Sequence, residues 1–199
     1  MGAAPDFVGY ENLISFIRER GIHRLEGDLV EIGAFMGGGT AKLAAFAREV
    51  GKRVFVVDVF EPSLDRTMSP RGVAAREVYE AFLEGRDMFA VYSESVRPFD
   101  NVVTIRQDSR TVRFPPEQRF VFAFIDGCHQ EEYVLSDFAL LWPRVVSGGC
   151  LGFHDYEYAD WPEVTIAVRR ILAQHREEIA ETCEVTGVYD IRSLLLIKR

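Results

Sequence analysis

The sequence predicts a single-domain α/β fold, in which a mostly parallel seven-stranded sheet ends in an antiparallel pair of strands and carries helices on both faces. Short apolar runs of strand length alternate along the chain with longer segments of helical periodicity. Several of the short runs are apolar throughout, as strands covered on both faces must be. The last two runs are joined by only a short turn, and strands joined so closely must be antiparallel.

Each element follows from its own pattern. A first helix is expected at residues 10–20, where apolar side chains form one stripe. Further helices, with apolar residues at three- and four-residue spacing, are expected from Thr40 to about Val50 and at residues 131–142 and 162–179. The parallel strands are expected at residues 29–33, 53–58, 101–105, 121–126 and 150–155, and the closing pair at 184–188 and 193–197.

The chain has 199 residues and contains no repeat, low-complexity tract or glycine- and serine-rich linker. We therefore expect one domain over residues 1–199, with an N-terminal helix in residues 1–26 and the core of the fold in residues 27–199. A domain of this length buries a hydrophobic core without help from disulfides or a structural metal.

Composition argues against several classes of function. The formal net charge is −8, so the basic footprint of a nucleic-acid-binding protein is absent and an anionic membrane surface is disfavoured. No apolar run reaches membrane-spanning length, and residues 1–6 lack the basic and apolar regions of a secretory signal. The three cysteines show no paired spacing, which argues against a zinc site or a disulfide framework. We expect a cytoplasmic protein.

Polar residues, most of them acidic, stand at the carboxyl ends of the predicted parallel strands. In sheets of this kind, ligands bind at these ends, near the point where the strand order reverses. The residues at these positions are Glu31 to Gly33, Asp58, Asp108, Asp126 and Asp155. They are the first candidates for a binding site.

The richest stretch, residues 31–40, reads EIGAFMGGGT and is called the glycine turn below. Its glycines at Gly33, Gly37 and Gly39 let the backbone turn tightly and approach a ligand. Their spacing fits neither the G-x-G-x-x-G of a dinucleotide site nor a phosphate loop that ends in G-K-[ST]. On these residues alone, the glycines could also do no more than shape the turn.

The pattern E-x-G-x-x-x-G-x-G-T resembles motif I of the class I S-adenosylmethionine-dependent methyltransferases, and the resemblance extends over residues 27–199. It implies a Rossmann-like methyltransferase fold whose core binds S-adenosylmethionine. It also implies that Asp58 receives the ribose hydroxyls and that Asp108 and Ser109 lie near adenine. The remaining cofactor-binding residues implied by the resemblance are Glu31, Gly33, Ala34, Phe35, Gly37, Gly39, Thr40 and Asp126.

A second sequence pattern, in the C-terminal half of the chain, indicates a subgroup within these methyltransferases. Residues 125–129 read IDGCH, Tyr133 follows, and Gly148-Gly149 precedes the pair His154-Asp155. This is similar to the subgroup related to macrocin-type O-methyltransferases and cephalosporin hydroxylase-like proteins. Ser147 stands where a proline is common before the two glycines, which affects a turn rather than the chemistry.

The resemblance also suggests a metal site. Related catechol and macrolide-sugar methyltransferases hold Mg²⁺ with an acid after the fourth strand and an acidic pair after the fifth, which implies Asp126, His154 and Asp155 as ligands here. If a metal binds, magnesium or manganese is the candidate, and the histidine favours a softer ion, such as Mn²⁺, Fe²⁺ or Zn²⁺, over magnesium. The choice between a metal and no metal stays open.

Without a metal, an imidazole could take the proton instead, so His129, His154 and Asp155 are the candidate catalytic residues. The alternative is that Asp126 contacts the cofactor and His129 caps the helix that begins near Glu131. The sequence leaves this choice open.

Two irregular stretches, residues 61–72 and 156–162, follow the second and fifth strands and are expected to flank the site. Tyr158 and Trp161 could sandwich a flat or sugar-like substrate, or simply pack over the sheet edge. Arg66 and Arg71 could meet an acidic substrate, although solvated arginines are the commoner case. Because no separate substrate domain is visible, specificity must come from these loops or from a second subunit, and we expect a homodimer.

These observations predict a methyltransferase that transfers a methyl group to a hydroxyl of a small molecule, such as a sugar or phenolic metabolite. One alternative is an NAD-dependent oxidoreductase, against which the spacing of Gly33 and Gly37 argues. Another alternative is a binding module that holds the cofactor without catalysis, against which the cluster of acids and histidines argues.

Overall fold

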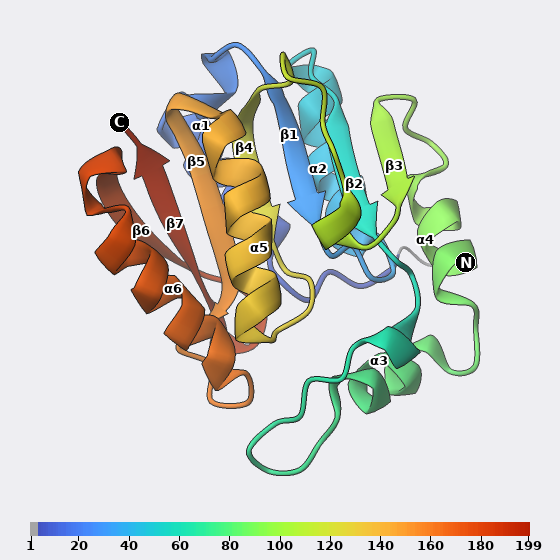
Figure 1. Cartoon of the computed structure of the whole chain (residues 1–199). Helices are drawn as coiled ribbons and strands as arrows, with labels where there is room; N and C mark the ends of the chain where they lie inside the picture. The colour runs from blue at the N-terminus through green and yellow to red at the C-terminus, as the bar shows by residue number, and fades with distance from the viewer. Residues whose placement is uncertain (1–3) are drawn as a thin grey trace.

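The computed structural model describes residues 4–199, and one seven-stranded sheet runs through it (Figure 1). The strand order is β3-β2-β1-β4-β5-β7-β6. β7 runs antiparallel to both of its neighbours, β5 and β6, and the other neighbouring pairs are parallel. The predicted fold class is therefore confirmed. The strands are β1 (Asp28–Ile32), β2 (Val54–Asp58), β3 (Val102–Arg106), β4 (Phe120–Ile125), β5 (Val145–Tyr156), β6 (Ile179–Thr186) and β7 (Arg192–Lys198).

Helices cover both faces of the sheet, with α5 and α6 on one face and α1 and α2 on the other (Figure 1). The helices are α1 (Tyr10–Glu19), α2 (Gly38–Glu49), α3 (Ala75–Leu83), α4 (Met88–Val96), α5 (Glu131–Leu141) and α6 (Pro162–Gln174). Within residues 4–199, no helix combines the length and the apolar character needed to cross a membrane.

The core lies on both sides of the sheet because the central strands are buried on both faces. Every residue of β4 is buried, and its side chains alternate between the two faces as strand geometry requires. Phe122 and Phe124 join the hydrophobic cluster beneath α1 and α2, while Ala123 and Ile125 join the cluster beneath α5 and α6. Burying a phenylalanine side chain completely stabilises the fold by about 1.5–3 kcal/mol.

Three boundaries differ from the prediction by more than two residues. The helix expected over residues 162–179 ends at Gln174, and Ile179 begins β6 by pairing with Lys198. His175 leaves the helical conformation with φ −113°, and an apolar residue at 179 suits the stripe of a helix as well as a strand. Periodicity alone could not separate these two cases.

β5 begins at Val145, five residues before the expected start at 150. The pair Gly148-Gly149 interrupts the strand pattern in the sequence, and the register with β4 shifts between Phe120 and Phe122 at the same level. β6 also begins earlier than the expected residue 184, because it starts directly after the end of α6 and its short turn.

Hydrogen bonds between neighbouring strands align the carboxyl ends of the central strands at one edge of the sheet. The N–H of Gly33 donates to the Val57 carbonyl (2.9 Å), and the N–H of Asp126 donates to the Ile32 carbonyl (2.8 Å). The segment between β2 and β3, which carries α3 and α4, extends past this edge of the sheet (Figure 1). It therefore lies beside the positions where the sequence places candidate site residues.

Candidate active site

A cavity of about 940 Å³ opens at the carboxyl edge of the sheet, within the size range of small-molecule sites. The glycine turn lines one end of it, and the residues that follow β4 and β5 line the other. Most of the candidate residues line it, namely Glu31, Gly33, Ala34, Phe35, Gly39, Asp58, Asp108, Ser109, Asp126, His129, His154 and Asp155. Sequence reasoning therefore placed these residues around one space.

Gly33 requires the absence of a side chain. Its φ is +88°, and a Cβ at this position would lie 2.0 Å from the Asp126 carbonyl oxygen. The turn can pass this closely under β4 only with glycine. Gly37 also has a positive φ of +78°, but its neighbours are Tyr92 and Ser95 of α4, so it shapes the turn away from the cavity.

The side chain of Asp58 holds the glycine turn in its observed shape through hydrogen bonds to backbone N–H groups. Its carboxylate accepts hydrogen bonds from the N–H groups of Ala34 (2.8 Å), Phe35 (3.1 Å) and Phe60 (2.6 Å). Burial raises the pKa of this carboxyl although the three N–H donors oppose the shift. The expected contact with ribose hydroxyls stays a prediction, because here the backbone uses both oxygens.

Glu31 joins three elements beneath the turn. It is 1% exposed, and its carboxylate accepts hydrogen bonds from the Tyr10 hydroxyl of α1 and the Thr40 hydroxyl of α2 (2.6 Å). Burial raises its pKa to about 8, against the effect of these two donors. Thr40 itself faces Glu31 rather than the cavity.

Asp108 and Ser109 line the cavity directly after β3, as the sequence predicts. Arg110 donates to Asp108 from its backbone N–H (3.0 Å) and its guanidinium group (2.9 and 3.2 Å). These hydrogen bonds hold the pKa of Asp108 below its ordinary value. The same guanidinium lies 4.0 Å from the ring centre of Tyr133.

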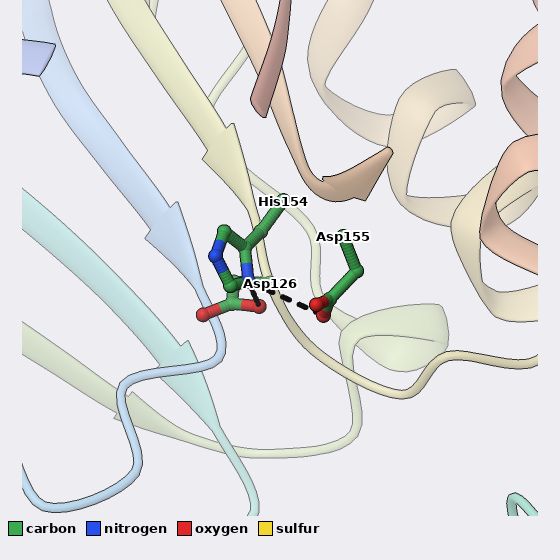
Figure 2. Close-up of side chains that lie close together, drawn as sticks. All are labelled: Asp126, His154 and Asp155. Carbon is green, nitrogen blue, oxygen red and sulfur yellow. Dashed lines mark hydrogen bonds and ion pairs between the residues drawn. The ribbon is translucent and has the colours of Figure 1, made fainter. Parts of the chain in front are cut away.

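Asp126, His154 and Asp155 point towards one another (Figure 2). The Nδ1 atom of His154 lies 3.1 Å from Asp126 Oδ1 and 3.2 Å from Asp155 Oδ2. Although burial opposes it, the two carboxylates raise the pKa of His154 above its ordinary value. Asp155 holds this place with a positive φ of +55°, an uncommon conformation for a residue with a side chain.

His129 adds a second imidazole to this cluster, and Asp126, His129, His154 and Asp155 are called the acid–imidazole group below. The Nε2 atom of His129 lies 3.0 Å from Asp155 Oδ2, and its ring stacks on Trp161 with the ring centres 4.8 Å apart. Burial by itself would lower the pKa of His129, but the carboxylates of Asp155 and Asp65 beside the ring raise it to about 10.

The alternative role of His129 as a helix cap is wrong. The first N–H of α5, at Glu131, donates to the side chain of Glu163 (2.9 Å). The His129 ring instead faces Asp155 and Trp161, within the cavity.

The donor set fits a divalent metal ion. Asp126, His154 and Asp155 each offer one ligand atom, and these atoms all lie within 4.8 Å of one another. One nitrogen and two carboxylate oxygens suit ions from magnesium to the borderline transition metals. The His154 Nδ1 atom already lies where it faces both carboxylates, so little rearrangement is needed for the three to share an ion.

The segment after β2 supplies a residue that sequence reasoning missed. Asp65 lies in residues 61–72, called the cover segment below, and its Oδ2 atom is 3.7 Å from His129 Nδ1. Because this stretch has no periodicity, nothing in the sequence placed Asp65 beside a residue 64 positions later. Only its position in a long loop after a strand could have drawn attention to it.

The two loops that flank the cavity are joined to each other. Arg71 of the cover segment binds Asp160 through two guanidinium nitrogens, one of them at 2.8 Å, so it is paired rather than simply solvated. Tyr158 and Trp161 line the cavity from the loop after β5, where they were expected to contact a substrate or pack on the sheet. Phe35 and Met36 both line the cavity, and Met36 is almost fully buried.

Comparison with known proteins agrees with this geometry. Residues 30–156, well over half of the chain, match the family model described as "Methyltransferase domain", and the chain belongs to this family. Protein R132 of Acanthamoeba polyphaga mimivirus is 45% identical over 51 residues, which are 25% of this chain; the match spans only 23% of that protein's length.

Two solved structures illustrate the likeness of fold. The O-methyltransferase NovP aligns over 95% of this chain and 78% of its own, with a TM-score of 0.66 and 20% identity. CalS11, a TDP-rhamnose 3'-O-methyltransferase of calicheamicin biosynthesis, aligns over 92% of this chain and 78% of its own, with a TM-score of 0.62 and 19% identity. At these identities the similarity concerns the fold.

Proposed function

We propose that this member of the methyltransferase-domain family transfers the methyl group of S-adenosylmethionine to a hydroxyl of a small molecule, such as a sugar or a phenol. One observation carries the proposal. A single cavity has the glycine turn at one end and the acid–imidazole group at the other. A methyl donor and a proton-accepting group are thus available in the same space.

The glycine turn is proposed to hold the cofactor. Gly33, Ala34 and Phe35 line the cavity from the glycine turn, while Asp58, Asp108 and Ser109 line it from the ends of β2 and β3. The carboxylates of Asp58 and Asp108 are assigned to the hydroxyls and base of an adenosine group. Binding there brings the reacting groups into line, and positioning of this kind is a large part of catalysis in transfer reactions.

The acid–imidazole group is proposed to accept the proton that the acceptor hydroxyl loses. Asp155 faces both imidazoles, and each ring keeps one buried nitrogen without a hydrogen-bond partner, Nδ1 of His129 and Nε2 of His154. Because the neighbouring carboxylates raise the pKa of both imidazoles, a ring can take this proton only after it has lost its own, and a cation bound beside the group would favour that loss.

Asp126, His154 and Asp155 would hold a divalent cation such as Mg²⁺ or Mn²⁺. When bound, S-adenosylmethionine supplies the activated methyl group, and such a cation lowers the pKa of a coordinated hydroxyl. The protein's own part is then to orient the acceptor between the cover segment and the loop after β5.

Calorimetric titration tests the proposal directly. We expect S-adenosylmethionine and S-adenosylhomocysteine to bind, while NAD at the same concentration gives no heat. Transfer of a labelled methyl group to a panel of sugars and phenols, with and without Mg²⁺ or Mn²⁺, then identifies the acceptor class. Binding of NAD without binding of S-adenosylmethionine would overturn the proposal.

A further inference from the structure

We infer that Asp65 is a positioning residue for His129, brought to the acid–imidazole group by the cover segment. This inference rests on the proposed function of that group. It assigns a role to a residue that comes from a loop rather than from the edge of the sheet. It also makes the group complete only when the cover segment lies over the cavity.

The Asp65 carboxylate is fixed from several sides. Its Oδ1 atom accepts hydrogen bonds from the backbone N–H (2.9 Å) and the hydroxyl (2.6 Å) of Thr67. Its Oδ2 atom accepts one from the Tyr79 hydroxyl (3.0 Å) and faces His129 Nδ1 at 3.7 Å. The side chain is 10% exposed. A carboxylate held this firmly and this deeply has little freedom to turn away from the imidazole.

His129 is in turn enclosed on three sides. Asp155 lies at its Nε2 edge, Asp65 lies at its Nδ1 edge, and Trp161 covers one face of the ring. Opposite edges of the ring thus meet carboxylates from different parts of the chain. This arrangement selects one orientation of the ring and holds it against Trp161.

The positioning also reaches the glycine turn. Tyr79, which donates to Asp65, packs against Phe35 with the ring centres 5.3 Å apart. Phe35 lies in the turn with a positive φ of +50°, and its N–H is bound by Asp58. A continuous line of contacts therefore runs from the turn through Tyr79 and Asp65 to His129.

Asp65→Asn tests the inference at one fixed pH, on the protein without added ligands. Because the ring of His129 stacks on Trp161, the ring current of the indole shifts the His129 ring protons upfield in a proton NMR spectrum. The chain has four histidines, and the signals that disappear in His129→Gln are those of His129. In Asp65→Asn we expect these protons to move towards the values of a free imidazole. Tyr79→Phe removes one hydrogen bond to Asp65 but keeps the carboxylate, so it should shift the His129 protons in the same direction but less than Asp65→Asn does.

The controls use the same segment. Ser63→Ala changes an exposed residue of the cover segment whose hydroxyl donates to Glu61 and not to Asp65, and it should leave the His129 signals in place. Asp65→Glu keeps the charge and should restore much of the shift. His129 signals that stay unchanged in both Asp65→Asn and Tyr79→Phe would overturn the inference.

Activity gives a second, separate readout. Once an acceptor is known, Asp65→Asn should lower kcat about tenfold, less than the roughly 100-fold or larger loss expected when an acid–base group itself is removed, because Asp65 acts only through His129. The affinity for S-adenosylmethionine should stay the same. A fall in cofactor affinity with kcat unchanged would contradict a positioning role. Failure of the wild-type protein to bind S-adenosylmethionine would remove the proposed function, yet the NMR shifts would still decide whether Asp65 positions His129.

Discussion

The two ends of the cavity are built in different ways. The glycine turn occupies ten consecutive residues, and its shape comes from the backbone, with Gly33 passing under β4 and Asp58 binding three N–H groups. The acid–imidazole group is built from side chains of separate segments, after β4 and in β5, and Asp65 of the cover segment faces its His129. A backbone site tolerates little change at its glycines, whereas a side-chain site depends on charge and orientation.

The largest effect is expected at Gly33. In Gly33→Ala the new methyl group would lie 2.0 Å from the Asp126 carbonyl oxygen, in a conformation that alanine rarely adopts. We expect a loss of at least about 4 kcal/mol in the free energy of unfolding, measured by urea denaturation, or no folded protein at all. Gly51→Ala is the matched control, because Gly51 also has a positive φ (+70°) but open space around it. It should cost only about 1 kcal/mol, and equal losses in the two variants would contradict the steric explanation.

The next effect is a pH dependence that belongs to Glu31. Its pKa in the folded protein is about 8, above the ordinary 4.5, so its contribution to stability is full below pH 4.5 and is lost as the pH rises towards 8. The free energy of unfolding of the wild type should therefore fall, relative to Glu31→Gln, by roughly 4 kcal/mol between pH 4.5 and 8.5. Denaturation at several pH values measures this. The exposed Glu26, changed to Gln, serves as control and should run parallel to the wild type.

At the other end of the cavity, charge rather than shape should matter. Asp155→Asn keeps the size of the side chain but removes the negative charge that faces both imidazoles. We expect methyl transfer to slow about 100-fold or more, the usual range for loss of an acid–base group. Calorimetry should show unchanged affinity for S-adenosylmethionine. Asp100→Asn, at an exposed position, should keep full activity; a normal rate in Asp155→Asn would remove this residue from the proposed chemistry.

The smallest effect is expected at the ion pair between the two loops. Arg71 is 74% exposed, so its pair with Asp160 is screened by salt. Arg71→Gln should leave the unfolding midpoint unchanged and raise KM for the acceptor by about two- to fivefold, as for a typical exposed pair. Raising the ionic strength should bring the wild type towards the variant. A large fall in the unfolding midpoint would show that the pair holds more than the two loops.

The same contrast explains what the sequence could predict. The glycine turn and the acids at the strand ends are local patterns, so the sheet, its antiparallel ending and the position of Gly33 followed from the residues themselves. The contact between Asp65 and His129 joins positions far apart in the chain, and no spacing rule encodes it. The end of α6 was misplaced for a related reason, since only pairing with Lys198 makes Ile179 part of a strand.

The place of β7 in the sheet has a consequence for how the domain is synthesised. β7 is inserted between β5 and β6, so that residues made last in this part of the chain join strands that were made earlier. When the ribosome has added residue 186, β5 still has one open edge and β6 has no partner among the strands of this sheet. Open edges are sites for wrong pairing with other chains, and they persist until residues 192–198 have left the exit tunnel. Chaperones that bind exposed strands would therefore act on this part of the chain mainly after β5 has formed and before β7 has left the exit tunnel.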